Sequence, residues 1–156
     1  MKLEKTLVLV KPDAIRRGML GKVITRFEEK GLLIAGVSSF VFSDELLREH
    51  YAHLADKPFF AGIADFMKSD ITIALCVVGI DVVAVVREIV GVTNGREALS
   101  GTVRGDYSVS VQRNLVHASD SKEAAEIEIN RFFPNGIPGD IFLGKAKEFY
   151  AIDELK

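Results

Sequence analysis

Apolar residues along the chain fall into two patterns, short unbroken runs and stripes at helical spacing. The runs predict strands at Thr6–Val10, Leu33–Phe42 and Ile71–Val78, of which the last is the strongest candidate for a buried strand. A shorter run, Leu115-Val116, predicts a final strand. The first strand ends at Lys11-Pro12, where we expect a loop.

Stripes of apolar residues predict the helices that separate these strands. Leu20, Val23, Ile24 and Phe27 form one stripe, and Gly31 is placed to end that helix. A second helix is expected from Ser43 or Asp44 to about Leu54, and a last one over Ser121–Phe132. Two more are expected between them. One begins at Pro58 and buries Phe60, Ile63, Ala64 and Met67, and the other begins at Asp81 and buries Val82, Val86 and Ile89.

The order of these elements predicts an α+β fold. An antiparallel sheet with helices packed on one face, arranged as in ferredoxin-like domains, is the simplest arrangement that accommodates them. Val92–Val111 has no sustained periodicity and is interpreted as a long loop before the last strand, and a loop of that length in a compact domain is usually functional. No repeat or linker divides residues 1–156, so we expect one domain, with residues 134–156 as a C-terminal tail that is hard to assign.

Composition is that of an ordinary globular protein. Hydrophobic residues make up 48% and charged residues 27% of the 156 residues, and the net charge is −2, so no basic field is present to hold a nucleic-acid backbone. The single cysteine, Cys76, cannot form an internal disulfide. No apolar stretch resembles a signal peptide or a membrane span, and we therefore expect a cytoplasmic protein without a membrane partner.

Several common sites are missing from the sequence. Neither the P-loop pattern nor the dinucleotide-binding glycine pattern occurs, and no cysteine cluster suggests zinc. His50 and His53 lie three residues apart on a predicted helix, but two ligands without a third make only a weak metal hypothesis.

His117 is the strongest candidate for chemistry. It lies between the last strand and a helix that begins near Asp120, which forms a plausible capping box with Glu123. On that helix Glu128 could reach back to one imidazole nitrogen, fixing the tautomer and leaving the lone pair of the other nitrogen free to attack. A packed, hydrogen-bonded histidine at a strand end is the alternative on these residues alone.

Scattered cations and one phenylalanine complete the candidate site. Lys11, Arg87, Arg104 and Arg113 could gather around His117 and neutralise a phosphoryl group during transfer, although each by itself reads as a surface charge. Phe59 precedes a buried residue of the helical stripe and should point elsewhere, either to close a crevice or to stack on a base.

Four separated motifs resemble those of the nucleoside diphosphate kinases. They are Lys11–Ala14, Lys57–Gly62, Gly101–Asp106 and Asn114–Ser121, and the similarity runs in register from about Lys5 to Phe133. The resemblance implies a ferredoxin-like enzyme that moves the γ-phosphate of a nucleoside triphosphate, mainly ATP, to a nucleoside diphosphate in two half-reactions through phosphorylated His117.

The same resemblance implies roles for individual residues. Glu128 and Ser119 would support the His117 ring, and Tyr51 would lie beside the transferred phosphate. Mg²⁺ would arrive with the nucleotide, with Asp120 as an outer-shell partner and no direct protein ligand. Lys11 would bridge the ribose hydroxyls and the transferred phosphate, and Asn114 would hold the sugar. Arg87, Thr93 and Arg104 would hold the β- and γ-phosphates, and the base would lie against Phe59, Ile63 and Val111.

The chain departs from the family pattern at Ala118, at Gly95 and Ser100, at Val92, where an acidic residue is common, and over residues 134–156. Ala118 stands where glycine is usual and implies either a helical or a slightly strained backbone. Gly95 and Ser100 stand where proline is usual and should loosen the long loop. Because the family assembles through this loop and its tail, we expect a homo-oligomer, with a hexamer favoured over a tetramer or dimer.

Two other functions fit parts of the pattern. A non-catalytic nucleotide-binding regulatory module on a ferredoxin-like sheet would use the cations and Phe59 but would not need His117 backed by Glu128. A single-strand nucleic-acid-binding protein would use the arginine-bearing loop, and the acidic balance of the chain makes that partner the least favoured.

Overall fold

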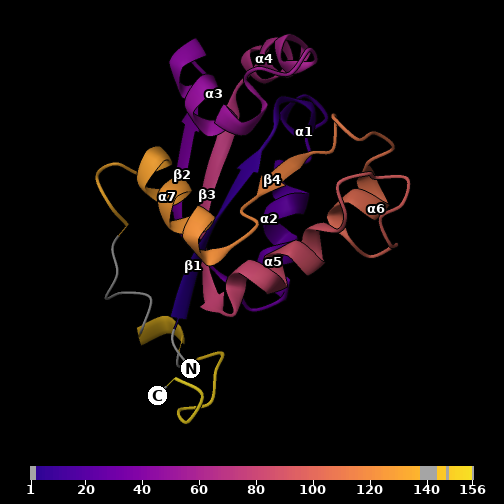
Figure 1. Cartoon of the computed structure of the whole chain (residues 1–156). Coiled ribbons are helices and arrows are strands. Elements are labelled where there is room, and N and C mark those ends of the chain that lie inside the picture. Colours follow the sequence, from indigo (N-terminus) through magenta and orange to yellow (C-terminus); the bar gives the residue numbers. More distant parts are fainter. Residues whose placement is uncertain (1–2, 138–143, 147, 156) are drawn as a thin grey trace.

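A four-stranded antiparallel sheet forms the centre of the molecule. The computed structural model describes residues 3–137, 144–146 and 148–155. The strands are β1 (Leu3–Val10), β2 (Leu33–Phe40), β3 (Thr72–Ile80) and β4 (Val116–Ala118), in the order β2-β3-β1-β4 (Figure 1). This order, with all neighbours antiparallel, confirms the ferredoxin-like α+β fold.

Helices occupy the connections between the strands, and one further helix follows the last strand. The main ones are α2 (Leu20–Glu29), α4 (Phe60–Lys68), α5 (Val82–Val90) and α7 (Lys122–Phe132). The shorter ones are α1 (Pro12–Arg16), α3 (Asp44–His50), the 3₁₀ turn η1 (Ala52–Leu54) and α6 (Val103–Tyr107). Among the described residues, no helix is long and apolar enough to cross a membrane.

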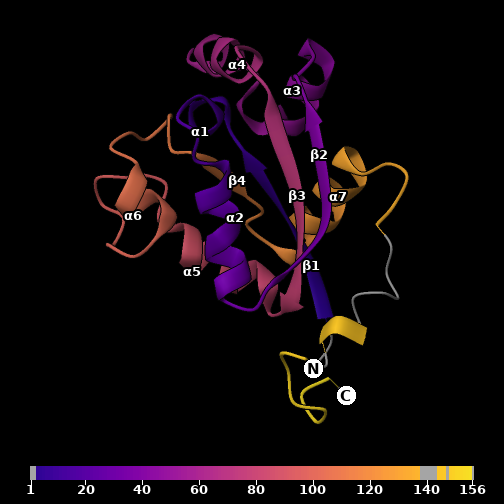
Figure 2. The same ribbon diagram turned by 180° about the vertical axis from the view of Figure 1, so that it is seen from behind.

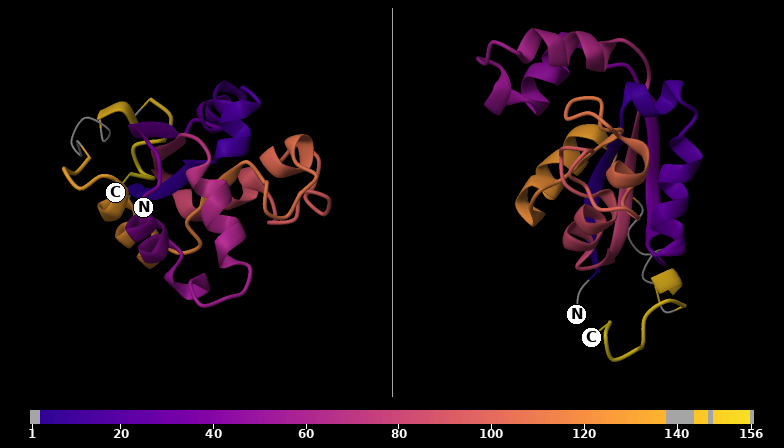
Figure 3. Two further views of the ribbon diagram at one scale, coloured as in Figure 1. Left: turned by 90° about the horizontal axis from the view of Figure 1, so that it is seen from above. Right: turned by 90° about the vertical axis from the view of Figure 1, so that its right-hand side faces the viewer.

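The helices cover both faces of the sheet, and the expectation of one covered face was wrong. Val8 and Val10 of β1 pack with the residues of α2 and α5, whereas Leu7 and Leu9 pack with those of α3, α4 and α7. Successive side chains of a strand point to opposite faces, so an unbroken apolar strand is buried on both sides. Figure 2 shows α2 over one face, and the side view in Figure 3 shows α2 and α7 on opposite sides of the sheet.

The register of the edge strand directs His117 toward α7. His117 pairs with Leu9 of β1, and paired residues of an antiparallel ladder project to the same face. Leu9 belongs to the core cluster that includes Ile129 and Phe132 of α7. The imidazole is therefore placed on the face where α7 presents Glu128.

The regions predicted as loops contain two short helices. Pro12 begins α1 directly after Lys11, and α6 lies inside the predicted loop, where the Thr102 hydroxyl accepts a hydrogen bond from the Gly105 N–H. Five residues are too few for a helical stripe to be distinguished from a loop. The loop is also built around its glycine, because a Cβ on Gly95 would lie 2.5 Å from the Ser108 carbonyl oxygen. The prediction that Gly95 loosens this loop therefore has no support in its packing.

Two further expectations about the backbone near His117 were wrong. Ala118 is a residue of β4 and has no positive φ, whereas Leu115 has φ of 71°. The N-cap of α7 is Ser121, whose hydroxyl accepts from the Ala124 N–H, so Asp120 does not cap this helix. The strained position therefore precedes His117 and does not follow it.

The described part of the tail returns to the lower end of the sheet. Ile80 at the end of β3 donates its backbone N–H to the Tyr150 hydroxyl at 3.2 Å. Ile137 packs against the core cluster of α3, α4 and α7. The contact of Tyr150 lies at the opposite end of β1 from Lys11, because Ile80 pairs with Leu3 (Figure 1).

Candidate active site

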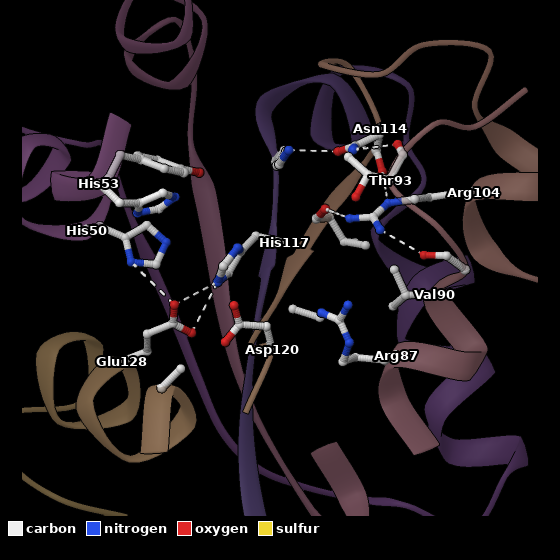
Figure 4. A pocket seen from close by; sticks show the side chains of 16 residues that line it. His50, His53, Arg87, Val90, Thr93, Arg104, Asn114, His117, Asp120 and Glu128 are labelled. Carbon is white, nitrogen blue, oxygen red and sulfur yellow. Dashed lines mark hydrogen bonds and ion pairs between the residues drawn. The ribbon is translucent and has the colours of Figure 1, made fainter. Parts of the chain in front are cut away.

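A polar pocket of about 470 Å³ opens beside the edge strand β4 (Figure 4). The residues that line it come from α3, η1, α5, α6, β4 and α7 and from the loops beside them, including the residue that follows β1. Of the residues predicted from the sequence, those lining this pocket are Lys11, Tyr51, Arg87, Thr93, Arg104, Asn114, His117, Asp120 and Glu128. Residues separated by up to 117 positions along the chain thus meet at one place.

One ring nitrogen of His117 is held by Glu128. Nε2 lies 3.0 Å and 3.1 Å from the two carboxylate oxygens, so it carries the ring proton and donates a hydrogen bond to Glu128. Figure 4 shows the other ring nitrogen, Nδ1, turned away from Glu128 and into the pocket. The predicted support of the imidazole by Glu128 is present, and a lone pair on Nδ1 faces the pocket.

Ser119 joins this pair to the sheet. Its buried hydroxyl donates to Glu128 Oε2 at 2.5 Å and accepts the Leu7 N–H at 3.3 Å. Burial by itself raises the pKa of Glu128, but the hydrogen bonds from His117 and Ser119 outweigh it and the pKa is lowered. Glu128 is therefore an acceptor with a fixed position and does not compete for the His117 proton.

Asp13 is a positioning residue to which the sequence reasoning gave no role. Its buried carboxylate accepts the Leu115 N–H at 3.0 Å, and the Lys11 N–H donates to the Leu115 carbonyl at 2.8 Å. The loop after β1 therefore holds Leu115 from both sides in its left-handed conformation, two residues before His117. The only sequence signal was that Asp13 follows Lys11-Pro12 in a recognised motif.

Lys11, Arg87 and Arg104 line the pocket, and Figure 4 shows the two arginines on the side opposite Glu128. The Lys11 ammonium donates to Asn114 Oδ1 at 2.7 Å, and Asn114 in turn donates to the backbone carbonyls of Thr93 and Val111. Burial, and then the charge of Arg104, lower the pKa of Lys11 to about 8. Burial, and then the charge of Arg87, lower the pKa of Arg104 to about 10. The positive charges of Lys11, Arg87 and Arg104 repel one another in this pocket, and a bound anion would offset that repulsion.

Arg104 also connects three backbone segments that form the wall of the pocket. Its guanidinium donates to the backbone carbonyls of Asn114, Gly91 and Val116 at 3.3, 2.8 and 2.7 Å. Arg113, by contrast, does not line the pocket and lies over the Phe66 ring, 5.9 Å from its centroid. The structure therefore separates the two loop arginines, and only Arg104 reaches the site.

An apolar crevice of about 580 Å³ adjoins the polar pocket. It contains Phe59, Ile63 and Val111, the three residues predicted at the base, and shares Lys11, Tyr51, Thr93 and Asn114 with the polar pocket. The Phe59 side chain is 56% exposed and Val111 49%, so both offer an open surface to a ligand. Burial raises the pKa of the Tyr51 phenol, which therefore stays a neutral hydrogen-bond donor between the two spaces.

Residues 4–137 match the family model described as nucleoside diphosphate kinase. The chain belongs to this family. It is 52% identical over 153 residues to the nucleoside diphosphate kinase of Parabacteroides distasonis, a match that covers 98% of this chain and all of the relative. It is 43% identical over 130 residues to the human nucleoside diphosphate kinase A, covering 83% of this chain and 86% of that one.

Solved structures of nucleoside diphosphate kinases share the fold. The enzyme from Encephalitozoon cuniculi is 37% identical, with a TM-score of 0.86 over 98% of this chain and 99% of that one. The enzyme from Halobacterium salinarum, solved in complex with CDP, is 38% identical, with a TM-score of 0.83 over 91% and 97% of the two chains.

Family membership confirms the predicted class of activity. The chain is a phosphotransferase that binds nucleotides and transfers phosphate between them, and nothing favours the non-catalytic alternative. The family model ends at residue 137, whereas the Parabacteroides match extends into the tail. The tail is therefore shared with at least one relative.

Proposed function

We propose that this nucleoside diphosphate kinase forms a covalent phosphohistidine at His117. The observation that carries the proposal is the orientation of the ring, with Nε2 bonded to Glu128 and Nδ1 turned away from Glu128 into the pocket that Lys11, Arg87 and Arg104 line. An imidazole in this state is a nucleophile whose tautomer does not have to change before attack.

In the first half-reaction, the Nδ1 lone pair attacks the γ-phosphorus of a nucleoside triphosphate, mainly ATP. The bond from this phosphorus to the bridging oxygen breaks, and the nucleoside diphosphate leaves with that electron pair. In the second half-reaction, a terminal oxygen of another nucleoside diphosphate attacks the phosphorus, and the P–N bond electrons return to Nδ1. The ring proton stays on Nε2, facing Glu128, throughout.

The cations stabilise the charge that moves in both steps. Lys11, Arg87 and Arg104 line the pocket next to His117 and would contact the transferred phosphoryl group and the diphosphate. Asn114, Thr93 and Tyr51 line both the polar pocket and the apolar crevice. Asn114 would hold the sugar, Thr93 would hold the phosphates, and Tyr51 would lie beside the transferred phosphate. Glu128 and Ser119 act through the ring orientation and do not touch the substrate.

Parallel lines in double-reciprocal plots of initial rate are the kinetic test of this proposal. Because the first product leaves before the second substrate binds, varying ATP at several fixed concentrations of a diphosphate should change the intercepts and leave the slopes unchanged. Intersecting lines would mean direct transfer in a ternary complex.

Weak base selectivity is expected from the crevice. Phe59, Ile63 and Val111 offer stacking and apolar contact, which accept every base, whereas buried hydrogen bonds are what reject an analogue strongly. Guanine, adenine, cytosine and uracil diphosphates should therefore differ by no more than about 100-fold in kcat/KM. A preference of about 10⁴-fold for one base, measured with the four diphosphates at one ATP concentration, would require a polar contact to the base edge.

A loss of kcat/KM above pH 8 is expected from Lys11. The pKa of Lys11 is about 8, below its ordinary value, so the ammonium is charged below pH 8 and neutral above it in the free enzyme. Rising pH should therefore lower kcat/KM for ATP by about tenfold per pH unit above 8. Lys11→Arg keeps its charge above pH 8, so in this variant the fall of kcat/KM should begin at a higher pH. This assignment would be contradicted if kcat/KM of the wild type stayed constant to pH 10, or if it fell over the same pH range in Lys11→Arg.

Mg²⁺ fits the pocket as a partner of the nucleotide. Asp120 is exposed at the pocket and can meet a hydrated ion, while the pocket supplies no set of carboxylates that could hold Mg²⁺ without phosphates. When bound, Mg²⁺ would neutralise phosphate charge, and Asp120 would orient one of its waters from the outer shell.

We also propose that the chain is a single domain of a cytoplasmic homo-oligomer, with a hexamer favoured over a tetramer or dimer. Leu99 and Val109 of the long loop are 79% and 80% exposed, which supports a contact between subunits there. Covering such side chains in an assembly would bury apolar surface that a monomer leaves in water.

A further inference from the structure

His50, His117 and Glu128 place three metal-ligating groups together at one side of the pocket. One donor atom from each lies within 4.8 Å of the others. They come from α3, β4 and α7, and Figure 4 shows them on the side of the pocket opposite Arg87 and Arg104. The sequence reasoning had paired His50 with His53 instead, and found no third ligand.

His50 is a neutral imidazole whose lone pair accepts from Arg131, a contact that a metal ion would replace. It is 6% exposed, and burial, followed by the nearby His117, lowers its pKa to about 3. Arg131 Nη1 lies 3.3 Å from Nδ1, and because a guanidinium only donates, Nδ1 carries the lone pair. The opposite nitrogen, Nε2, has no hydrogen-bond partner among the described residues, so the ring can shift without losing a bond there.

The local charge favours a cation on this side. The Glu128 carboxylate lies 3.9 Å from His50 Nδ1 and 3.0 Å from His117 Nε2. Arg131 opposes a cation at Nδ1, but its Nε is bonded to Glu49 at 2.7 Å, which offsets its charge and can hold it if the contact to His50 is lost.

The donor set selects a class of ion. Two imidazoles, one carboxylate and an open position toward a pocket form a zinc-type site, with neighbouring ligand atoms about 3.4 Å apart when tetrahedral. Glu128 Oε1 lies 3.0 Å from His117 Nε2 and 3.9 Å from His50 Nδ1, one separation on each side of this value. Mg²⁺ prefers six oxygen ligands and would not be held by two imidazoles.

We propose that His50, His117 and Glu128 bind a divalent transition-metal ion of the zinc class, and that this ion inhibits phosphorylation of His117. The ion takes the lone pair of His50 Nδ1, one Glu128 oxygen and His117 Nε2, whose proton is released to solvent. A metal on Nε2 withdraws electron density from the ring and so weakens Nδ1 as a nucleophile.

Calorimetric titration of zinc into the full chain tests the site directly. The protein is stripped of metal and nucleotide, and millimolar Mg²⁺ is present throughout. One zinc ion should bind per chain, and His50→Gln and Glu128→Gln should each weaken binding by about tenfold or more. His53→Gln, at the exposed histidine of the same pocket, should change the affinity by less than about twofold. Arg131→Gln removes the opposing charge and should tighten binding by about threefold or more.

Equal affinities for wild type and His50→Gln, or an equal loss in His53→Gln, would show surface binding and overturn the proposal. Circular dichroism confirms that each variant is folded. Cobalt provides a second readout, because a tetrahedral site gives intense visible absorption that His50→Gln should lose.

Inhibition is tested separately, and this part rests on His117 as the proposed nucleophile. Zinc-loaded protein, freed of excess zinc, should take up little phosphate from labelled ATP. The label that His50→Gln acquires without zinc should persist at the same zinc concentration. Absence of label in zinc-free wild type would refute the proposed function, while the calorimetric result would still decide the metal site.

Discussion

His117→Asn is expected to abolish both phosphate uptake from ATP and turnover, with a loss of at least about 10⁴-fold. Asparagine keeps a polar side chain of similar reach next to Glu128 but supplies no lone pair on nitrogen that can attack phosphorus. Nucleotide binding should persist, because Lys11, Arg87 and Phe59 are untouched. Labelled ATP measures the uptake, and fluorescence of a nucleotide analogue measures the binding.

Two matched variants separate the nucleophile from its surroundings. His53→Asn changes the exposed histidine of the same pocket and should label as the wild type does. Glu128→Gln should slow labelling without abolishing it, since Glu128 orients the ring and does not attack. Full labelling of His117→Asn would identify a different nucleophile.

Loss of the Lys11 charge is expected to lower kcat by about 10²-fold or more, because the negative charge that develops on the phosphate in the transition state then loses a stabilising cation. In Lys11→Met the pocket keeps its shape but loses its ammonium. The folded-state pKa of about 8 lies below the ordinary value of 10.5, so charging Lys11 opposes folding near pH 7, an effect that fades as pH rises through 8 to 10.5. Lys11→Met removes this opposition and should therefore melt at or above the wild-type temperature near pH 7.

Arg104→Ala provides a contrast and Lys68→Ala a control. Arg104→Ala should lose activity by a similar factor and also melt at a lower temperature, because three backbone carbonyls lose their donor. Lys68 pairs with Asp44 at the surface, away from both pockets, and its loss should change neither property. A fully active Lys11→Met would remove Lys11 from the mechanism.

Much of the fold could be predicted from the sequence because the two central strands are apolar on both faces. The runs Thr6–Val10 and Ile71–Val78 fall within β1 and β3 almost entirely. Strands that are apolar on both faces also indicate helices on both sides of the sheet, and the prediction of helices on one face did not take this into account. The helices α1 and α6 were not predicted, because five residues contain too little periodicity and α1 follows a residue that reads as the end of a strand.

The candidate site could be predicted where local spacing or a motif carried the information. His117 at a strand end and Glu128 on the next helix are eleven positions apart, and their contact follows from a strand running into a helix. Contacts made over longer separations have no such signal. The Asp13 carboxylate on the Leu115 N–H, and His50 between His117 and Arg131, depend on how β1, α3 and α7 pack, which no short pattern records.

Location of the phosphate on the protein is the most direct measurement of the central claim. The full chain is incubated with ATP and Mg²⁺, kept alkaline to preserve a P–N bond, digested, and sequenced by tandem mass spectrometry. The account predicts one phosphoryl group per chain, on His117, stable in alkali, lost in acid and transferred to added GDP. Phosphate on another residue, or an unmodified protein that still turns over, would contradict it.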